Sequence, residues 1–225
     1  MSEIVQNINK IREELPKAVT LVAVSKTKPN EDILEAYNTG HRVFGENKVQ
    51  ELIRKSEELP RDIEWHFIGH LQSNKVKYIA PFVSLIHAVD SLKLLKAINK
   101  EAAKNKRVIN CLLQCKIAQE DSKFGMSYSD IEGLLTSEAF SELNNISIRG
   151  MMGMATNTSD LDQVRGEFKS LHTIFIDLKK NHFADNPEFK ELSMGMSHDY
   201  NLAIEEESTM IRVGSSIFGE RNYSK

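Results

Sequence analysis

Residues 20–47 read TLVAVSKTKPNEDILEAYNTGHRVFGEN, and this stretch decides the predicted fold. The stretch begins with an apolar run that contains β-branched residues, which is typical of a buried strand. This run belongs to a strand candidate at 19–25. Helical periodicity follows, and a second strand candidate covers 42–46. A strand, a helix and a strand in this order predict a βαβ unit with parallel strands.

The same alternation continues along the chain. The helix over 160–180 is the clearest, because its apolar residues recur at steps of three and four after a cap at Ser159 or Asp160. Two more amphipathic helices are predicted at 91–104 and in the first segment, which Pro16 ends. The remaining strand candidates are 64–69, 84–89, 107–117, 147–154, 190–194 and 209–214.

Eight strands alternating with helices predict an α/β fold. The pattern suits a closed (β/α)₈ TIM barrel or an open doubly wound sheet, and periodicity does not choose between them. The chain ends soon after the last strand candidate, so we expect the extra N-terminal helix to fill the place of an eighth helix. No linker or repeat marks a boundary, and one domain over 1–225 is the simpler interpretation.

Charge and composition exclude some classes of function. The formal net charge is −3, so no overall positive field attracts nucleic acid or an anionic membrane. No N-terminal signal and no long apolar run is present, and we expect a cytoplasmic protein. Cys111 and Cys115 lie in an apolar stretch and are predicted to be reduced core residues.

Lys26 stands just past the end of the first strand. In either architecture ligands bind at the carboxyl ends of the strands. An amine desolvated there has a lowered pKa and can form a Schiff base with an aldehyde. The alternative is a surface lysine whose stem packs on apolar atoms.

Serines and glycines gather after the seventh and eighth strand candidates: Ser193, Gly195, Ser197, Gly214, Ser215 and Ser216. Small residues let backbone N–H groups approach an anion, and a helix N-terminus adds partial positive charge. In barrels phosphate often binds after strands seven and eight. Two such turns favour an anion site over ordinary tight turns.

Other polar residues give weaker signals. Arg212 is predicted to face the barrel interior, where it needs a carboxylate or a ligand as partner. Asn47 lies at a strand-to-helix junction, where an amide caps the helix or faces a ligand. The spacing of His66 and His70 does not match the helical two-histidine pattern of zinc sites, and we predict no metal.

Taken together, the segments resemble the YggS/PROSC family of pyridoxal phosphate homeostasis proteins. The motifs that carry the resemblance span 21–221: AVSKTKP, FGENKVQE, WHFIGHLQSNK, HAVDS, QEDSKFG, GMMGMA, LSMGMSHDYNLAI and MIRVGSSIFGER. The resemblance implies a single TIM barrel that binds pyridoxal 5′-phosphate (PLP), of fold type III, similar to the N-terminal domain of alanine racemase. It resolves the choice of architecture toward the barrel.

The resemblance also implies roles for residues. Lys26 looks like the lysine that forms the Schiff base, and Arg212 matches the arginine that faces the pyridine nitrogen. Because guanidinium only donates, that nitrogen stays unprotonated and the cofactor is a poor electron sink. The implied cofactor-binding set is Lys26, Asn47, Ser193, Ser197, Arg212, Gly214 and Ser215, with no catalytic residue and no metal.

The implied function is to hold, buffer and deliver PLP inside the cell, with effects on amino and keto acid balance. We expect a monomer with PLP-dependent apoenzymes as possible partners.

Alanine racemases take a second base from an added C-terminal domain, which this chain lacks, so we expect no efficient turnover. A racemase or lyase of low activity is the alternative, and a phosphosugar barrel using Lys26 is a third hypothesis.

The sequence departs from the family pattern at three positions, which are Lys48, Lys116 and Glu207. Lys48 stands where tyrosine is usual. We expect its position at the start of a helix to turn it outward. None of the three removes a proposed cofactor contact.

Overall fold

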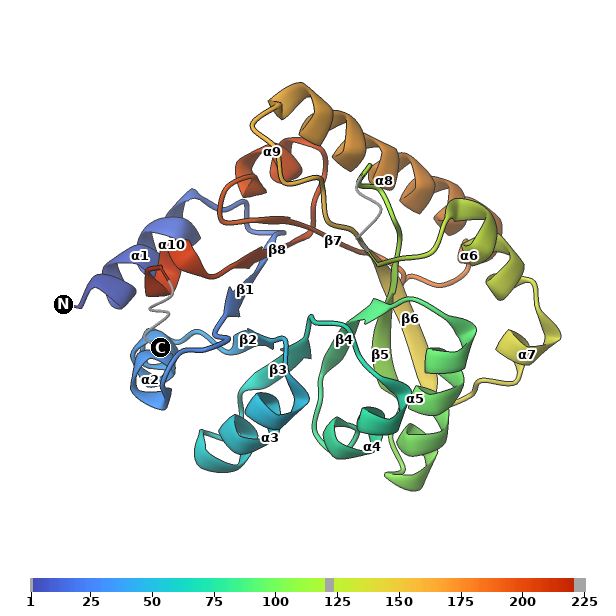
Figure 1. Ribbon diagram of the computed structural model, residues 1–225, viewed down its shortest axis with the longest axis horizontal. Helices are drawn as coiled ribbons and strands as arrows, with labels where there is room; N and C mark the ends of the chain where they lie inside the picture. The colour runs from blue at the N-terminus through green and yellow to red at the C-terminus, as the bar shows by residue number, and fades with distance from the viewer. Residues whose placement is uncertain (1, 120–123, 221–225) are drawn as a thin grey trace.

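In the computed structural model, which describes residues 2–119 and 124–220, eight parallel strands form a closed barrel. Each strand pairs with the next in sequence, and the last pairs with the first (Figure 1). The closure excludes the open doubly wound sheet. The strands are β1 (Thr20–Val24), β2 (Val43–Glu46), β3 (Glu64–Phe67), β4 (Leu85–Val89), β5 (Ile109–Gln114), β6 (Ile146–Met152), β7 (Glu191–Met196) and β8 (Met210–Val213).

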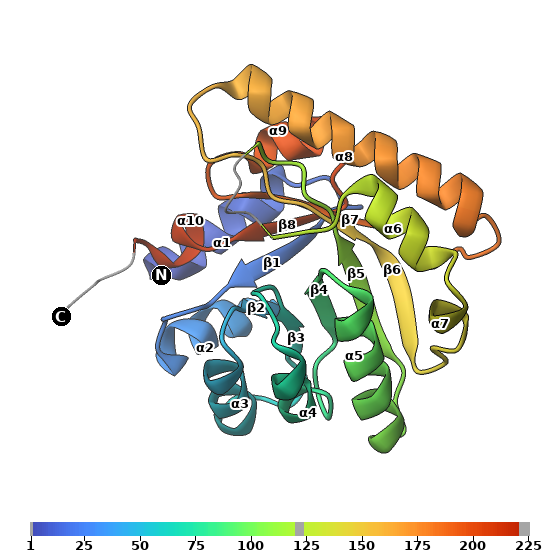
Figure 2. The same ribbon diagram turned by 45° about the vertical axis from the view of Figure 1, so that its right-hand side comes forward.

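Helices surround the strands. The longest, α8, lies outside the barrel beside α9 (Figure 2) and begins after Asp160, whose side chain accepts hydrogen bonds from the N–H groups of Asp162 and Gln163. Asp160 is therefore the cap. The helices are α1 (Glu3–Glu14), α2 (Asn30–Asn38), α3 (Val49–Glu58), α4 (Val76–Ile79), α5 (Leu92–Lys104), α6 (Tyr128–Leu135), α7 (Glu138–Ser141), α8 (Leu161–His182), α9 (Tyr200–Glu205) and α10 (Ser215–Phe218), with a 3₁₀ turn η1 (Ser73–Lys75).

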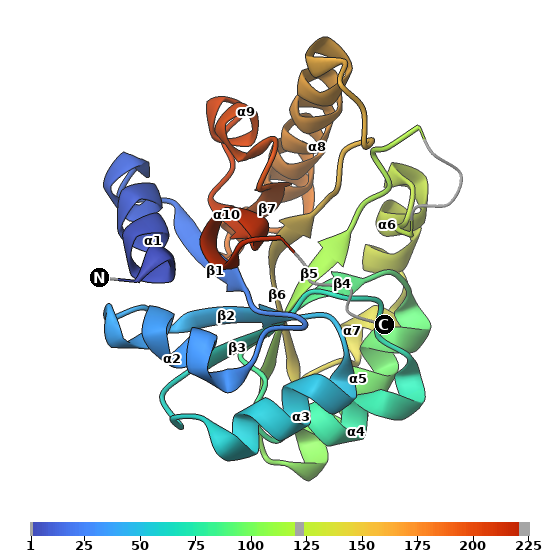
Figure 3. The same cartoon turned by 60° about the vertical axis from the view of Figure 1, so that its left-hand side comes forward.

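The N-terminal helix α1 completes the outer ring. It lies between α2 and the pair α9 and α10 (Figure 3). Its Asn7 donates a hydrogen bond to the carbonyl of Ile217 in α10, and its Arg12 donates to the carbonyl of Thr39 after α2. The expectation that this helix fills the eighth place is confirmed.

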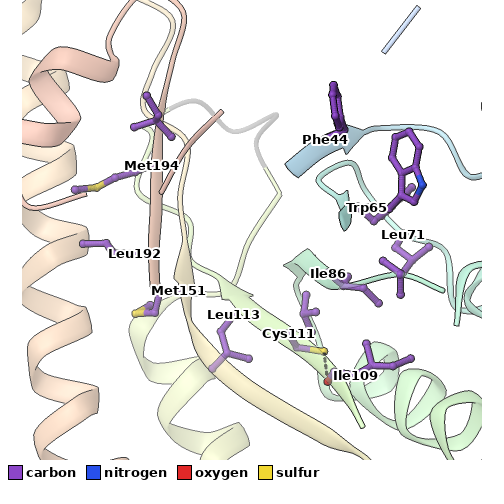
Figure 4. Packing of buried hydrophobic residues seen from close by; sticks show 14 of the residues in the cluster. Phe44, Trp65, Leu71, Ile86, Ile109, Cys111, Leu113, Met151, Leu192 and Met194 are labelled. Carbon is purple, nitrogen blue, oxygen red and sulfur yellow. Dashed lines mark hydrogen bonds between the residues drawn. The ribbon is translucent and has the colours of Figure 1, made fainter. Parts of the chain in front are cut away.

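Two apolar layers stabilise the barrel. The larger lies between strands and helices and contains Ile211, Val213 and both cysteines (Figure 4 shows part of it). The smaller fills the barrel interior with Val22, Leu85, Ala88, Leu112, Met152 and Met210. Arg212 alternates with Ile211 and Val213 and so faces inward, as predicted.

The cysteines are ordinary core residues. Both Cys111 and Cys115 are free and buried. Burial raises the pKa of Cys115 to about 11 and that of Cys111 further, so both thiols stay protonated and unreactive at neutral pH. Among the described residues, no helix combines the length and apolarity needed to cross a membrane.

His41, just before β2, gives the stability a pH dependence. It is buried, its Nε2 hydrogen-bonds the carbonyl of Val43 at 2.8 Å, and its ring meets Phe44 edge-on. Burial lowers its pKa from 6.5 to about 4. Below pH 6.5 the unfolded chain therefore binds a proton that the folded chain does not, and stability present above that pH is lost as the pH falls toward 4.

Because of the lowered pKa of His41, we expect the free energy of unfolding to fall by about 1.4 kcal/mol for each unit by which the pH is lowered, or by about 2 kcal/mol between pH 6.5 and 5. Urea unfolding of wild type and of His41→Gln at neutral and acidic pH measures this contribution. The variant should lose less stability on acidification by that amount. An equal loss in both proteins would contradict the assignment.

Candidate functional site

A pocket opens at the carboxyl ends of the strands and encloses about 240 Å³. We call it the upper pocket. Six of the seven predicted site residues line it, which are Lys26, Asn47, Ser197, Arg212, Gly214 and Ser215. Its other lining residues, which sequence reasoning did not assign to the site, are Val24, Lys28, Ile68, Met154, Met196, His198 and Gly219.

Lys26 lies in the short loop between β1 and α2. The loop is fixed from both sides: the N–H of Ser25 donates to the carbonyl of Gly45, and the N–H of Thr27 donates to Glu51 Oε1 at 2.6 Å. Thr27 has a φ of 67°, in the left-handed region that non-glycine residues rarely adopt. The backbone on either side of Lys26 is thus held in one conformation, with the lysine at the pocket wall.

A buried ion cluster under this loop supplies that rigidity. Lys55 of α3 is fully buried, and its Nζ donates to the carbonyl of Ser25, to Glu46 Oε1 and to Glu51 Oε1, each at 2.8 Å. The hydroxyl of Ser25 also donates to Glu46, at 2.5 Å. Burial raises the pKa of Glu46, against the opposing charge of Lys55. Sequence reasoning missed the cluster, although its i, i+4 spacing of Glu51 and Lys55 was visible.

The second lysine at the pocket, Lys28, has a structural role. Its Nζ donates to the carbonyl of Phe218 at 2.7 Å and to that of Glu220 at 3.1 Å. These bonds join the β1–α2 loop to the last residue of α10 and to the segment after it. The amine of Lys28 is therefore engaged with backbone acceptors.

The turns after β7 and β8 meet at the pocket. The N–H of Gly214 donates to the Ser197 hydroxyl at 3.2 Å, which joins the two turns. A Cβ on Gly214 would lie 3.1 Å from the carbonyl oxygen of Val24, so glycine permits the close packing of this turn on β1. Ser215 begins α10, where the first N–H groups have no carbonyl partner within the helix. This arrangement suits an anion.

Arg212 forms the inner wall. It is 4 % exposed, and it donates to Ser193 Oγ at 2.6 Å and to the carbonyl of Gly153 at 3.0 Å. Burial lowers its pKa to about 10, so it stays charged at neutral pH. Among the described residues no carboxylate hydrogen-bonds Arg212, and the charge of Asp199 acts on it only through space, opposing the effect of burial on its pKa.

Ser193 does not line the upper pocket. It is fully buried on β7, behind Arg212, and its hydroxyl also hydrogen-bonds Nδ1 of His87 at 3.0 Å. The structure thus brings six of the predicted residues to one pocket and places the seventh beneath them, where it orients the arginine.

Asn47 lines the pocket and does not cap α3. The cap position is Lys48, with no capping side chain, so the capping interpretation is wrong. Lys48 itself does not line the upper pocket. The Asn47 Oδ1 atom is buried and has no hydrogen-bond partner in the described part of the chain. Buried polar atoms are rarely left unpaired, so Oδ1 marks a place for a polar ligand atom.

The other motif residues lie elsewhere. His66 is buried inside the barrel and His70 stacks on Phe124, with its Nδ1 3.3 Å from Asp90. Residues 2–119 and 124–220 contain no group of three side chains placed to hold a metal. Residues 120–123 of the QEDSKFG motif and Arg221 lie outside the described residues.

Comparison with known proteins assigns the family. The family model of the alanine racemase N-terminal domain matches residues 1–222. A pyridoxal phosphate homeostasis protein of Vibrio alginolyticus is 41% identical over 239 residues, covering 100% of both chains. The chain belongs to the pyridoxal phosphate homeostasis protein family. A member from Aquifex aeolicus is 39% identical over 99% of this chain and 97% of its own, and one from Escherichia coli K12 is 36% identical over the full length of both.

Solved structures agree with this family assignment. PipY of Synechococcus elongatus PCC7942 without PLP superposes with a TM-score of 0.90 at 37% identity, covering 96% of this chain and all of PipY. The PLP-bound form of PipY superposes with a TM-score of 0.87 at 36% identity, with the same coverage of both chains. Alanine racemase from E. faecalis, at 15% identity and a TM-score of 0.70, covers 98% of this chain with 58% of its own length and shows the shared barrel fold alone.

Proposed function

We propose that this chain binds PLP in the upper pocket as a Schiff base with Lys26 and serves in intracellular PLP homeostasis. The observation that carries the proposal is the convergence in one pocket of an amine, an anion-binding pair of turns and a buried arginine. A homologue at 36% identity has a structure with PLP bound.

The residues present fit this cofactor. Gly214 gives a turn with no side chain to fill it, and the Ser197 and Ser215 hydroxyls stand beside it to receive a phosphate. The unpaired Oδ1 atom of Asn47 lies at the pocket wall and can accept a hydrogen bond from a ligand. The cofactor supplies an aldehyde and an aromatic ring able to delocalise electrons.

Each side chain has a separate task in the proposal. The Lys26 amine condenses with the aldehyde and releases one water molecule. Arg212, oriented by Ser193, can only donate, so it holds the ring nitrogen unprotonated and weakens electron withdrawal. The result favours retention of the cofactor over turnover of amino acids.

The first experiment identifies the covalent partner. The full chain should be yellow, keep its visible absorbance through dialysis, and after borohydride reduction carry a cofactor-sized mass increment on the peptide that contains Lys26. Incubation with amino acids followed by chiral chromatography separates a carrier, which gives stoichiometric change, from a racemase or lyase, which gives catalytic change. An increment on another peptide, or none, would reject the proposal.

The proposal extends to the protein's setting. We propose a cytoplasmic monomer that passes PLP to apoenzymes. The relatives named pyridoxal phosphate homeostasis proteins support the part of this proposal that concerns PLP. Sedimentation of the holoprotein and recovery of activity by a PLP-dependent apoenzyme mixed with it measure these two points.

A further inference from the structure

A second cavity lies at the opposite, amino end of the barrel and encloses about 210 Å³. We call it the lower cavity. It is lined by the first residues of β1, β2, β3, β4, β7 and β8, together with Ser84, His66, Asn110 and Arg149. None of the residues that line the upper pocket lines it. In most barrels this end serves stability, so a polar cavity there calls for an explanation.

His66 is the most buried polar side chain of the lower cavity. It is 5 % exposed, and its Nδ1 lies 3.1 Å from Nε2 of His87. Within 2–119 and 124–220 its second ring nitrogen, Nε2, has no hydrogen-bond partner. This nitrogen is not among the buried unpaired atoms, so it is open to the lower cavity, where a hydrogen-bond partner can approach it.

A chain of hydrogen bonds fixes which kind of partner this is. Arg212 can only donate, so Ser193 accepts from it and has its own proton free to donate to His87 Nδ1. His87 is neutral, because burial lowers its pKa well below 6.5, so its proton sits on Nε2 and is donated to His66 Nδ1. His66 then carries its proton on Nε2 and offers a donor to the lower cavity.

Charged side chains of both signs surround this donor. Arg149 of β6 lines the cavity and forms an ion pair with Glu188. Glu191 and Glu64, the first residues of β7 and β3, bring two carboxylates to the same space. Glu191 also accepts a hydrogen bond from Thr209. The lower cavity thus combines donors for a carboxylate with acceptors for an ammonium group.

We propose that the lower cavity is a second binding site, which takes a small zwitterion carrying one carboxylate and one ammonium group, such as a short α-amino acid. The carboxylate accepts from His66 Nε2–H and Arg149, and the ammonium donates to Glu64 and Glu191. The cavity volume of about 210 Å³ is sufficient for a ligand of a few heavy atoms. Glycine and alanine are of this size.

The same chain couples the two ends of the barrel. An acceptor on His66 Nε2–H makes Nδ1 a stronger acceptor, and the effect passes through His87 and Ser193 to Arg212 because hydrogen bonds in series polarise one another. A ligand bound in the lower cavity is therefore expected to change the hydrogen bonding of Arg212 in the upper pocket.

The test uses the isotopically labelled full chain and NMR at neutral pH, with glycine as the probe and with acetate and methylammonium as single-charge controls. We expect saturable shifts at Thr20, Ser84 and Asn110, with glycine binding at least about tenfold more tightly than either control, since one charge-assisted hydrogen bond is worth about that factor. Glu191→Gln should weaken glycine binding by about tenfold. Glu188→Gln, which leaves the lining carboxylates in place, should not weaken it.

Two further variants separate this site from the upper pocket. Lys26→Ala should leave glycine binding unchanged, so the second site stands or fails independently of the Schiff base. Ser193→Ala should weaken glycine binding, because His87 loses the donor that sets the tautomer of both histidines, and it should abolish the shift that glycine causes at the Arg212 side chain. Ser193→Thr should restore both. Shifts confined to Gly214 and Ser215, non-saturable shifts, or equal binding of acetate would overturn the proposal.

Discussion

Replacing Lys26 by alanine is expected to reduce the cofactor fixed by borohydride from stoichiometric to undetectable, whereas Lys28→Ala should leave it stoichiometric. Both lysines line the upper pocket, but the amine of Lys28 donates to the carbonyls of Phe218 and Glu220. An amine that donates to two backbone carbonyls must give up these hydrogen bonds before it can attack an aldehyde. Lys26 is the expected site of covalent capture because it follows the carboxyl end of β1, at the wall of the upper pocket.

Intact-protein mass spectrometry after reduction measures this directly, and peptide mapping names the residue. Noncovalent PLP should still bind Lys26→Ala through the turns around Ser197 and Gly214, with weaker affinity and without the absorbance of the imine. Lys28→Ala is the matched control, because it removes an amine from the same wall. A stoichiometric label on Lys26→Ala would exclude Lys26 as the bonding residue.

Replacing Lys55 by methionine is expected to lower the free energy of unfolding by about 3–5 kcal/mol, because it leaves a buried carboxylate without its counter-charge. Glu46 and Lys55 are both fully buried, and the Nζ of Lys55 also holds the loop that carries Lys26 through the carbonyl of Ser25. The variant should therefore lose both stability and the fixed position of that loop.

Urea unfolding of the apoprotein gives the stability change. Arg54→Met is the control on the same helix: Arg54 pairs with Glu58 on the surface, where such a pair contributes about 0.5 kcal/mol or less. The double variant Lys55→Met, Glu46→Leu should recover much of the loss, because it removes the stranded charge. A cost for Lys55→Met no larger than for Arg54→Met would refute the role of the buried cluster.

Much of the fold was accessible from the sequence because buried parallel strands are nearly continuous apolar runs. The strand predicted at 42–46 corresponds to β2 (Val43–Glu46), and the strand predicted at 107–117 corresponds to β5 (Ile109–Gln114). The strand predicted at 190–194 extends to Met196, past Gly195 at a φ of 93°, since its pairing with β8 continues after a shift in register. A pattern of residue types carries no information about such a shift.

The site was predictable where it follows from position at a strand end, as for Lys26, Gly214 and Ser215. It was not predictable where side chains meet across the barrel. The contact of Ser193 with His87 joins β7 to β4, and that of His87 with His66 joins β4 to β3. Closure of the barrel brings these side chains together, and no local spacing records it. The same limit applies to Asn47, whose capping role was excluded only by the position of α3.

The pairing of β1 with β8 has a consequence for biosynthesis. The upper pocket takes Lys26 from one end of the chain and Arg212, Gly214 and Ser215 from the other. A nascent chain on the ribosome cannot assemble this pocket until its last strand has emerged and docked. A ligand that binds there selects the finished barrel over every partly folded form, and so acts as a late checkpoint on maturation.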